Sequence, residues 1–182
     1  MLFRSIMKEF PEAIISVDTY RSQVAKHSVE AGASIINDIS AGVLDEKMFE
    51  TVAELNVPYI LMHMQGSPKN MQQNPHYEDV VLEVNEFLSE KIQALKSLGV
   101  NDIILDPGFG VGFGKALHHN YELMDKMDLI GFGEYPILVG ISRKSMITQL
   151  LNISAKEALN GTSVLNLISF QKGANILRVH DV

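Results

Sequence analysis

Polar residues that close apolar segments are the first candidates for chemistry in this sequence. Residues 103–105 read Ile-Ile-Leu, and Asp106 follows them directly, ahead of Pro107. A short run of branched apolar residues is typical of a buried strand, and proline cannot donate to a sheet ladder, so the strand should end at Asp106. Ligands of α/β sheets and barrels bind at the carboxyl ends of the strands. Asp106 is therefore a candidate ligand-binding carboxylate, while the alternative of a simple turn cap stays open.

The same design recurs along the chain, where other apolar segments also end in polar side chains. The candidates at these ends are Asp18, Asn37, Ser142, Lys144, Arg178 and His180. Because parallel strands bring their carboxyl ends to one side, the residues expected to ring one mouth are Asp106, Asp18, Asn37, Lys144, Arg178 and His180. Arg178 and His180 are two apart and should share a face of their strand. Carboxylate and amide acceptors beside cationic donors suit a ligand with an N–H-bearing heterocycle at one end and an anion at the other.

Structural roles remain open for several of these side chains. Asp18-Thr19 could form a helix N-cap, and Asn37-Asp38 could satisfy the backbone of a turn. Arg178 and His180 could pair with Asp181 or another carboxylate. A separate histidine, His63, stands between two methionines, faces the opposite way from them and is expected to be structural.

The elements that must position these residues alternate between strand and helix. Strands are expected at residues 13–19, 34–39, 58–64, 103–106, 136–142 and 175–182. Helices are expected at residues 1–10, 21–31, 46–55, 78–98, 118–130, 145–151 and 155–172. No two strands are adjacent in sequence, so the pattern predicts an α/β fold of βαβ units with parallel strands. The polar stretch 65–76 is the one long irregular loop, a kind that often forms a functional lid.

The composition restricts the class of protein. The chain has 182 residues, of which 46% are hydrophobic, and no linker or repeat interrupts it, so we expect one domain over 1–182. A net charge of -7 argues against a general nucleic-acid or anionic-membrane surface. The absence of cysteine excludes disulfides and thiolate chemistry. Without a membrane-spanning run or the apolar core of a secretory signal, a cytoplasmic location is expected.

A glycine-rich stretch follows Asp106 and has the look of a phosphate-binding loop. It runs from Gly108 to Lys115, but Phe109 and Ala116 stand where the Walker pattern needs Gly and Ser or Thr. We therefore expect a flexible, ligand-adjacent loop. No spacing of His and carboxylates gives a complete metal site.

Six segments, in order along the chain, resemble the motifs of dihydropteroate synthases. They are Ile-Ser-Val-Asp18-Thr, Ile-Ile-Asn37-Asp-Ile, Leu-Met-His-Met64-Gln-Gly, Leu-Asp106-Pro-Gly-Phe-Gly, Gly140-Ile-Ser-Arg-Lys144-Ser and Leu-Arg178-Val-His180-Asp-Val. The resemblance implies a (β/α)8 TIM barrel, of which this chain holds about strands 3–8. It also implies the condensation of 6-hydroxymethyl-7,8-dihydropterin diphosphate with 4-aminobenzoate in folate biosynthesis, by an enzyme that sulfonamides target.

The resemblance assigns a role to each matched residue. Asp18, Asn37 and Asp106 are expected to hold the amino and ring N–H edge of the pterin. The catalytic group is expected to comprise Lys144 at the pterin carbonyl and ring nitrogen, with Arg178 and His180 at the leaving diphosphate. The remaining substrate-binding residues implied by the motifs are Ser142 and Arg143, beside the 4-aminobenzoate, together with Met62 and Gly140.

Two departures from the family pattern qualify this expectation. The chain opens near the family's third strand, so the Asn that coordinates Mg²⁺ in the family, and the last helix, are expected to lie outside it. We therefore expect the chain to be poorly stable and weakly active or inactive alone, and the full-length family to form homodimers. The pair Val111-Gly112 is an insertion in the usual loop, which leaves open which of Phe109 and Phe113 lies near the ligand.

Two alternatives to the synthase remain open at this stage. One is a related barrel that binds methyltetrahydrofolate for methyl transfer. The other is a non-catalytic fragment that keeps only the pterin pocket.

Overall fold

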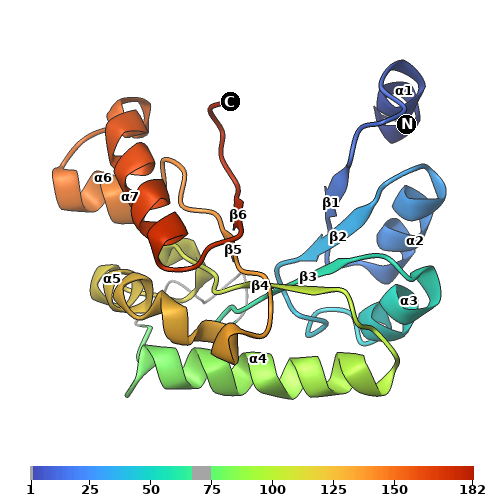
Figure 1. The fold of residues 1–182 in the computed structure, drawn as a ribbon, viewed down its shortest axis with the longest axis horizontal. Coiled ribbons are helices and arrows are strands. Elements are labelled where there is room, and N and C mark those ends of the chain that lie inside the picture. The colour runs from blue at the N-terminus through green and yellow to red at the C-terminus, as the bar shows by residue number, and fades with distance from the viewer. Residues whose placement is uncertain (1, 67–74) are drawn as a thin grey trace. The chain divides into compact units, whose positions relative to one another are not determined.

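The computed structural model describes residues 2–66 and 75–182 and forms two compact units (Figure 1). The first unit comprises the chain up to Met62 together with Glu90–Ile104, and the second comprises His63–Ser89 and Leu105–Val182. Most of the loop expected at 65–76 lies outside the described residues. Whether 1–182 acts as one domain stays a prediction.

Parallel strands form the centre of the first unit. Strand β1 (Ser16–Asp18) pairs in parallel with β2 (Ile35–Asp38), which pairs in parallel with β3 (Tyr59–Met62). The register places Asp18 opposite Asn37. Strand β4 (Ile103–Asp106) begins in this unit, where the amide of Tyr59 donates to the carbonyl of Asp102 at 2.9 Å. The alternation of strand and helix predicted this parallel arrangement, which is confirmed.

Helices cover the strands of the first unit. These are α1 (Leu2–Glu9), α2 (Ser22–Glu30), α3 (Met48–Leu55) and the second half of α4 (Val80–Ser97). The side chains of Ile36, Met48 and Val52 are fully buried, and Phe49 packs edge-on against Tyr59 with ring centroids 5.8 Å apart. Burial of this apolar surface is the main stabilising contribution available to the unit.

The second unit repeats the alternation of parallel strands and helices. Leu105 in β4 bridges in parallel to Ile137, just before β5 (Leu138–Val139), and β5 pairs in parallel with β6 (Ile176–Leu177). The helical elements are the first half of α4, η1 (Val111–Phe113), α5 (Leu117–Asp125), η2 (Met127–Gly133), α6 (Ser145–Leu151), η3 (Ala155–Glu157) and α7 (Leu159–Gln171). Several apolar side chains, among them Leu105, Leu123 and Val139, are fully buried in it.

Three predicted elements of this unit are shorter than the sequence pattern indicates. The strand expected at 136–142 ends at Val139, because residues 141–144 form a turn closed by the Lys144 amide on the Ile141 carbonyl at 3.1 Å. The last strand covers 176–177 rather than 175–182. The helix expected at 118–130 breaks after Asp125, and Gly131 and Phe132 take positive φ values of 63° and 55°.

No helix among residues 2–66 and 75–182 is both long enough and apolar enough to span a membrane.

Candidate functional site

In the first unit, two of the predicted site residues lie side by side at the ends of neighbouring strands. Asp18 is the last residue of β1, and Asn37 stands opposite it in β2. The Asn37 Nδ2 donates to Asp18 Oδ1 at 2.5 Å. The Oδ1 of Asn37 is buried and has no hydrogen-bond partner among the described residues. A buried acceptor left unpaired is costly, so it is suited to an N–H group brought by a ligand.

The adjacent carboxylate, Asp38, has a different role from Asn37. It is fully buried and accepts from the amide and hydroxyl of Ser40, the amide of Gly42 and the hydroxyl of Tyr59, at 2.7–2.8 Å. Successive side chains of a strand point to opposite faces, which separates the two residues. Asp38 therefore accepts the hydrogen bonds from the backbone of the turn after β2, and the side chain of Asn37 is not needed for them.

Two further residues of this unit were named from the sequence. Met62 ends β3 and is buried. The N-cap residue of α2 is Arg21, which has no side-chain cap hydrogen bond, so the alternative of an N-cap at Asp18-Thr19 is wrong. Thr19 Oγ1 accepts from the amide of Arg21 at 3.1 Å.

In the second unit, Asp106 is a buried carboxylate close to positive charges. Its side chain is at the end of β4, and the residue is 8% exposed. Burial raises the pKa of Asp106, while Lys144, the hydrogen bond from the Gly108 amide, Lys115 and Arg178 act in the opposite direction. A carboxylate in such a place favours a ligand that donates N–H bonds to it.

Lys144 reaches over the glycine-rich loop that follows Asp106. Its Nζ donates to the carbonyl of Phe109 at 2.5 Å and lies 4.7 Å from the centroid of the Phe113 ring. Phe109 is fully buried and Phe113 is half-buried. Of the two phenylalanines whose roles the sequence left open, Phe113 is therefore the one that stacks beneath the candidate catalytic lysine, a cation–π contact.

Gly140 separates Lys144 from Arg178. A Cβ atom built on Gly140 would lie 3.8 Å from the Cβ of Arg178 and 4.0 Å from the Nζ of Lys144. The Arg178 amide donates to the carbonyl of Val139 at 2.9 Å, which fixes the residue at the end of the β5–β6 pair. The bare backbone of Gly140 is thus flanked by two of the predicted cations.

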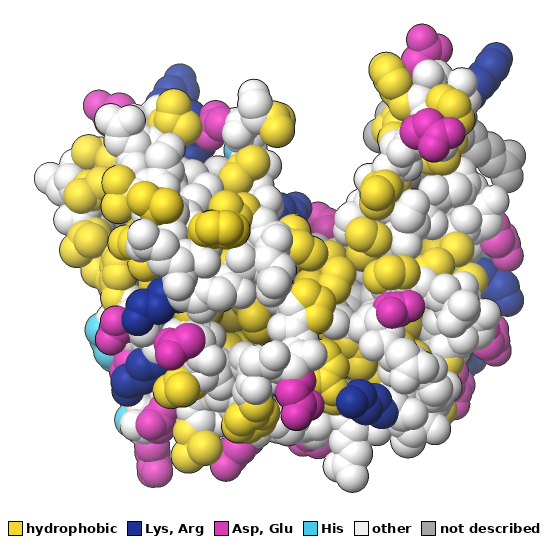
Figure 2. Space-filling model, viewed as in Figure 1, with side chains coloured by type: hydrophobic (Ala, Val, Ile, Leu, Met, Phe, Trp, Pro, Cys, Tyr) yellow, Lys and Arg dark blue, Asp and Glu magenta, His cyan; other side chains and the backbone are white. Residues whose placement is uncertain are grey.

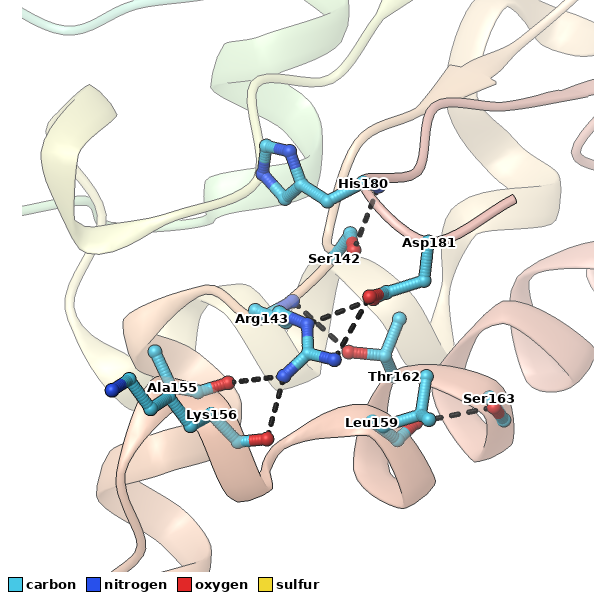
Figure 3. Close-up of polar contacts among 9 residues, drawn as sticks. All are labelled: Ser142, Arg143, Ala155, Lys156, Leu159, Thr162, Ser163, His180 and Asp181. Carbon is cyan, nitrogen blue, oxygen red and sulfur yellow. Dashed lines mark hydrogen bonds and ion pairs between the residues drawn. The ribbon is translucent and has the colours of Figure 1, made fainter.

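Ser142 and Arg143 make contacts that hold the C-terminal segment (Figure 3). The guanidinium of Arg143 donates to both carboxylate oxygens of Asp181 at 2.8 Å, and to the carbonyls of Ala155 and Lys156 at 2.7 Å. Ser142 Oγ accepts from the amide of His180 at 3.2 Å. The imidazole of His180 points away from the Arg143–Asp181 pair in the same view. Asp181 therefore pairs with Arg143, a partner that the sequence did not indicate.

Hydrogen bonds pin the glycine-rich loop at several points. The Gly110 amide donates to Asn120 Oδ1 at 2.6 Å, and the Phe113 amide donates to the Gly110 carbonyl at 3.0 Å. Asn120 Nδ2 in turn donates to the carbonyls of Lys115 and Ala116. These contacts give the loop a defined path between Asp106 and α5.

Sequence reasoning missed a buried pair beneath the loop. The Nζ of Lys115 lies 2.8 Å from Nδ1 of His63, and both residues are buried. The prediction that His63 is structural fits its ring contacts with Phe87 and Tyr77. Lysine at the end of a loop is usually exposed, so only the surrounding glycines and apolar residues could have signalled its burial.

No group of three or more His, Cys, Asp or Glu side chains in the described part of the chain could hold a metal ion.

Proteins of similar sequence and structure are described as pterin-binding enzymes and dihydropteroate synthases. The family described as "Pterin binding enzyme" matches residues 2–180. The dihydropteroate synthase of Escherichia coli K12 is 46% identical over 173 residues, which are 94% of this chain and 60% of that protein. Yersinia pestis dihydropteroate synthase, solved with a sulfonamide drug complex, matches the whole chain and 65% of its own length with a TM-score of 0.94 and 40% identity.

A third relative was solved with a product-like ligand. Dihydropteroate synthase from Xanthomonas albilineans in complex with 7,8-dihydropteroate matches this chain with a TM-score of 0.89 and 35% identity. The match covers the whole of this chain and 68% of the Xanthomonas protein. The chain thus spans about three fifths of the length of the E. coli relative. The α/β fold with parallel strands is confirmed, as part of the barrel of these proteins. The residues from 2 to 180 carry the pattern of a single family, and the chain belongs to the pterin-binding enzymes.

Proposed function

We propose that this chain is the pterin- and diphosphate-binding part of a dihydropteroate synthase, with residues 1–182 acting as one domain. The reaction joins 6-hydroxymethyl-7,8-dihydropterin diphosphate to 4-aminobenzoate and releases pyrophosphate. The observation that carries the proposal is the buried carboxylate of Asp106 with Lys144 and Arg178 among its charged neighbours. The motif match over nearly the whole chain supports it.

The heterocycle would be held by acceptors. Asp106 can accept two parallel N–H bonds from the amino-pyrimidine edge, which gives both strength and orientation. The unpaired Oδ1 of Asn37 offers a further acceptor, and its amide already orients Asp18. Met62 supplies an apolar surface at the end of β3.

The leaving group would be held by cations. When the bond between the exocyclic methylene carbon and the diphosphate oxygen breaks, its electron pair stays on the diphosphate. Arg178 and His180 would bind this growing negative charge, and Lys144 would contact the pterin carbonyl and ring nitrogen. Stabilising charge that develops in the transition state is commonly the largest catalytic contribution.

The amine of 4-aminobenzoate must be positioned by the site but needs no activation by a protein group. Its lone pair forms the new C–N bond at the methylene carbon, and the nitrogen then loses a proton. Ser142 and Arg143 would border this substrate, and their bonds to the 180–181 segment would keep Arg178 and His180 in place. No protein nucleophile is required, in keeping with a chain that has no cysteine. No step is assigned to the Mg²⁺ that is expected from the resemblance.

The test is a titration of the 182-residue chain with 6-hydroxymethylpterin, followed by fluorescence, with and without pyrophosphate and Mg²⁺. The proposal predicts saturable pterin binding that pyrophosphate strengthens, because the two ligands occupy neighbouring halves of one substrate site. Binding of the pterin without any coupling to pyrophosphate would favour the methyltetrahydrofolate-type barrel or a non-catalytic pterin-binding fragment. Absence of pterin binding would contradict the proposal.

We also propose that the assembled protein is a homodimer through the outer surface of α6 and α7. Val164, Leu167 and Phe170 are spaced three residues apart on α7 and are 57–65% exposed. Leu150 and Leu151 of α6 add to this apolar surface, and Figure 2 shows hydrophobic side chains gathered over these helices. A patch of this kind is typical of a protein interface.

Sedimentation across a concentration series tests this dimer. The unchanged chain should self-associate, and Leu167→Glu should abolish the association. Leu82→Glu is the control, because Leu82 is similarly exposed (56%) but lies on α4. A chain that stays monomeric throughout, or a Leu167→Glu variant that still associates, would contradict the dimer.

A further inference from the structure

Four residues of the second unit form a closed ring of hydrogen bonds beneath the candidate site. The His63 amide donates to the Asp106 carbonyl at 3.0 Å, and the Gly108 amide donates to Asp106 Oδ1 at 2.8 Å. The Gly108 carbonyl accepts from Lys115 Nζ at 3.0 Å, and the same Nζ lies 2.8 Å from His63 Nδ1. The ring therefore links the Asp106 carboxylate to the Lys115 amine through one glycine.

The amine at the bottom of this ring is shielded from water. Lys115 is 0% exposed, and burial lowers its pKa from 10.5 to about 7, against the attraction of Asp106. Burial also lowers the pKa of His63 well below its usual value, so the imidazole is neutral and its Nδ1 can accept. Both the ammonium and the neutral amine have at least two N–H groups, enough for Gly108 and His63. The ring can thus persist while its charge changes.

The space around Gly108 leaves no room for a side chain at this position. With φ at +71°, a Cβ on Gly108 would fall 1.9 Å from the His63 carbonyl oxygen and 3.2 Å from Lys115 Nζ. The glycine is therefore clamped between the carboxylate on one side and the His63–Lys115 pair on the other. Lys115 is thus linked to the Asp106 side chain through the carbonyl and the amide of Gly108.

Other charged groups also act on this ring. Lys144 from the turn before α6 repels Lys115, and Lys115 contributes to the lowered pKa of His119 on α5. Asp106 attracts the Lys115 amine, and Lys144 and Arg178 also lower the pKa of Asp106. The buried amine, whose direct contacts are His63 Nδ1 and the Gly108 carbonyl, is therefore one of three cations among the described residues that act on the carboxylate proposed to bind substrate.

We propose that Lys115, in contact with His63, is a positioning residue that fixes the Asp106 carboxylate through Gly108 and, together with Lys144, favours its ionised form for an N–H-donating heterocycle. This inference rests on the proposed function of Asp106. Lys115 itself does not touch the substrate, and it acts through Gly108. A purely structural lysine would affect folding without changing how Asp106 titrates.

The test compares Lys115→Met with the unchanged chain. Methionine keeps an unbranched side chain as far as the ε position and removes the amine. Lys126→Met is the matched control, since Lys126 pairs with Glu122 on the surface. The two readouts are the pH titration of the Asp106 side-chain carboxyl carbon by NMR, and the affinity for 6-hydroxymethylpterin between about pH 5 and about pH 9.

The inference predicts that Lys115→Met raises the pKa of Asp106 and shifts the acid limb of pterin binding upward by the same interval. Affinity at neutral pH should also fall by about tenfold, as expected for a misplaced charged acceptor, and Lys126→Met should change neither readout. An Asp106 titration that is unchanged in folded Lys115→Met would overturn the inference.

If Lys115→Met does not fold, the inference is tested on the unchanged chain. The NMR titration curve of its Asp106 carboxyl carbon should then show a second step at about pH 7, the pH at which the labelled Lys115 Nζ titrates. Lack of that step would overturn the inference. If the unchanged chain binds no pterin, the proposed function fails, and the titration of Asp106 still decides whether Lys115 controls its charge.

Discussion

Arg143 and Asp181 form a two-pronged ion pair, in which Nε and Nη2 each donate to a different carboxylate oxygen at 2.8 Å. The hydrogen bonds to Asp181 lower the carboxyl pKa and raise that of the guanidinium. Arg143 also takes a positive φ of 52°, with its amide bonded to Thr162 Oγ1. The pair ties the turn before α6 to the segment that carries Arg178 and His180.

Replacing Arg143 by Lys should loosen this segment. A lysine ammonium cannot reproduce the planar two-pronged contact. We expect faster amide exchange at residues 178–181 and pyrophosphate binding weakened about threefold to tenfold, because the cations lose their orientation. Hydrogen exchange and calorimetry measure the two effects. Arg21→Lys, at an exposed position of the first unit, is the control. Equal amide exchange at residues 178–181 in both variants would contradict the proposed link between Arg143 and this segment.

Replacing Gly108 by Ala should lower the free energy of unfolding by more than the cost of a positive φ alone. Its φ is +71°, and the added Cβ would meet a backbone carbonyl at 1.9 Å, so we expect a loss of about 3 kcal/mol or more in the free energy of unfolding. Gly173→Ala is the matched control, because Gly173 has φ +98° and open space around it. That variant should lose only about 1 kcal/mol. Denaturant unfolding of both checks the difference, and equal losses would count against the clamp at Gly108.

Truncation of Asp38 should mainly lower stability, whereas truncation of its neighbour Asn37 should mainly lower pterin affinity. Asp38→Ala leaves buried donors of Ser40, Gly42 and Tyr59 without an acceptor, so it should cost about 3 kcal/mol of stability. Asn37→Ala removes one bond to Asp18 and an already unpaired oxygen, and should change stability by less than about 1 kcal/mol. Pterin affinity should nonetheless fall about tenfold in Asn37→Ala. Unfolding curves and pterin titration of the two variants measure this, and the reverse pattern would contradict the division of roles.

Lys115 should make stability depend on pH above neutrality. Its pKa is about 7 in the folded chain and 10.5 for an ordinary lysine, so the unfolded state binds more protons between these values. Stability from this group therefore rises with pH through that window, by up to about 1.4 kcal/mol per pH unit, and is lost as pH falls through about 7. Tyr59 and Tyr77 have raised pKa values, so their contributions change only above about pH 10.

Urea unfolding between about pH 7.5 and about pH 9.5 measures this slope. The unchanged chain should gain stability with pH relative to Lys115→Met, in which the titrating amine is absent. Groups remote from Lys115 titrate alike in both chains and cancel in the difference. Identical slopes would show that Lys115 is protonated throughout the range.

The position of Asp106 could be predicted from sequence because its signals are local. An apolar run, a proline and glycines mark the end of a strand, and the alternation of strands with helices predicts parallel pairing. The same reasoning placed Asp18 and Asn37 at neighbouring strand ends, where they pair. Convergence of all six strand-end residues on one rim stays a prediction, as do their roles toward substrate.

Long-range contacts could not be predicted in the same way. Arg143 is bonded to a residue 38 positions away, and nothing local to either residue indicates it. The strand before it stops at Val139, ahead of the 141–144 turn in which Arg143 takes a left-handed conformation that is uncommon for residues other than glycine. Lys115 is buried against the general preference of lysine, through partners at positions 63 and 108.

Pterin affinity of Asp106→Asn tests the central claim most directly. The variant keeps an oxygen for the Gly108 amide but loses the negative charge that would bind the amino-pyrimidine edge. We predict binding at least about tenfold weaker, while Asp102→Asn, the same change at an exposed position four residues earlier, binds as the unchanged chain does. Equal affinity of Asp106→Asn and the unchanged chain would contradict the assignment of this carboxylate as the pterin acceptor.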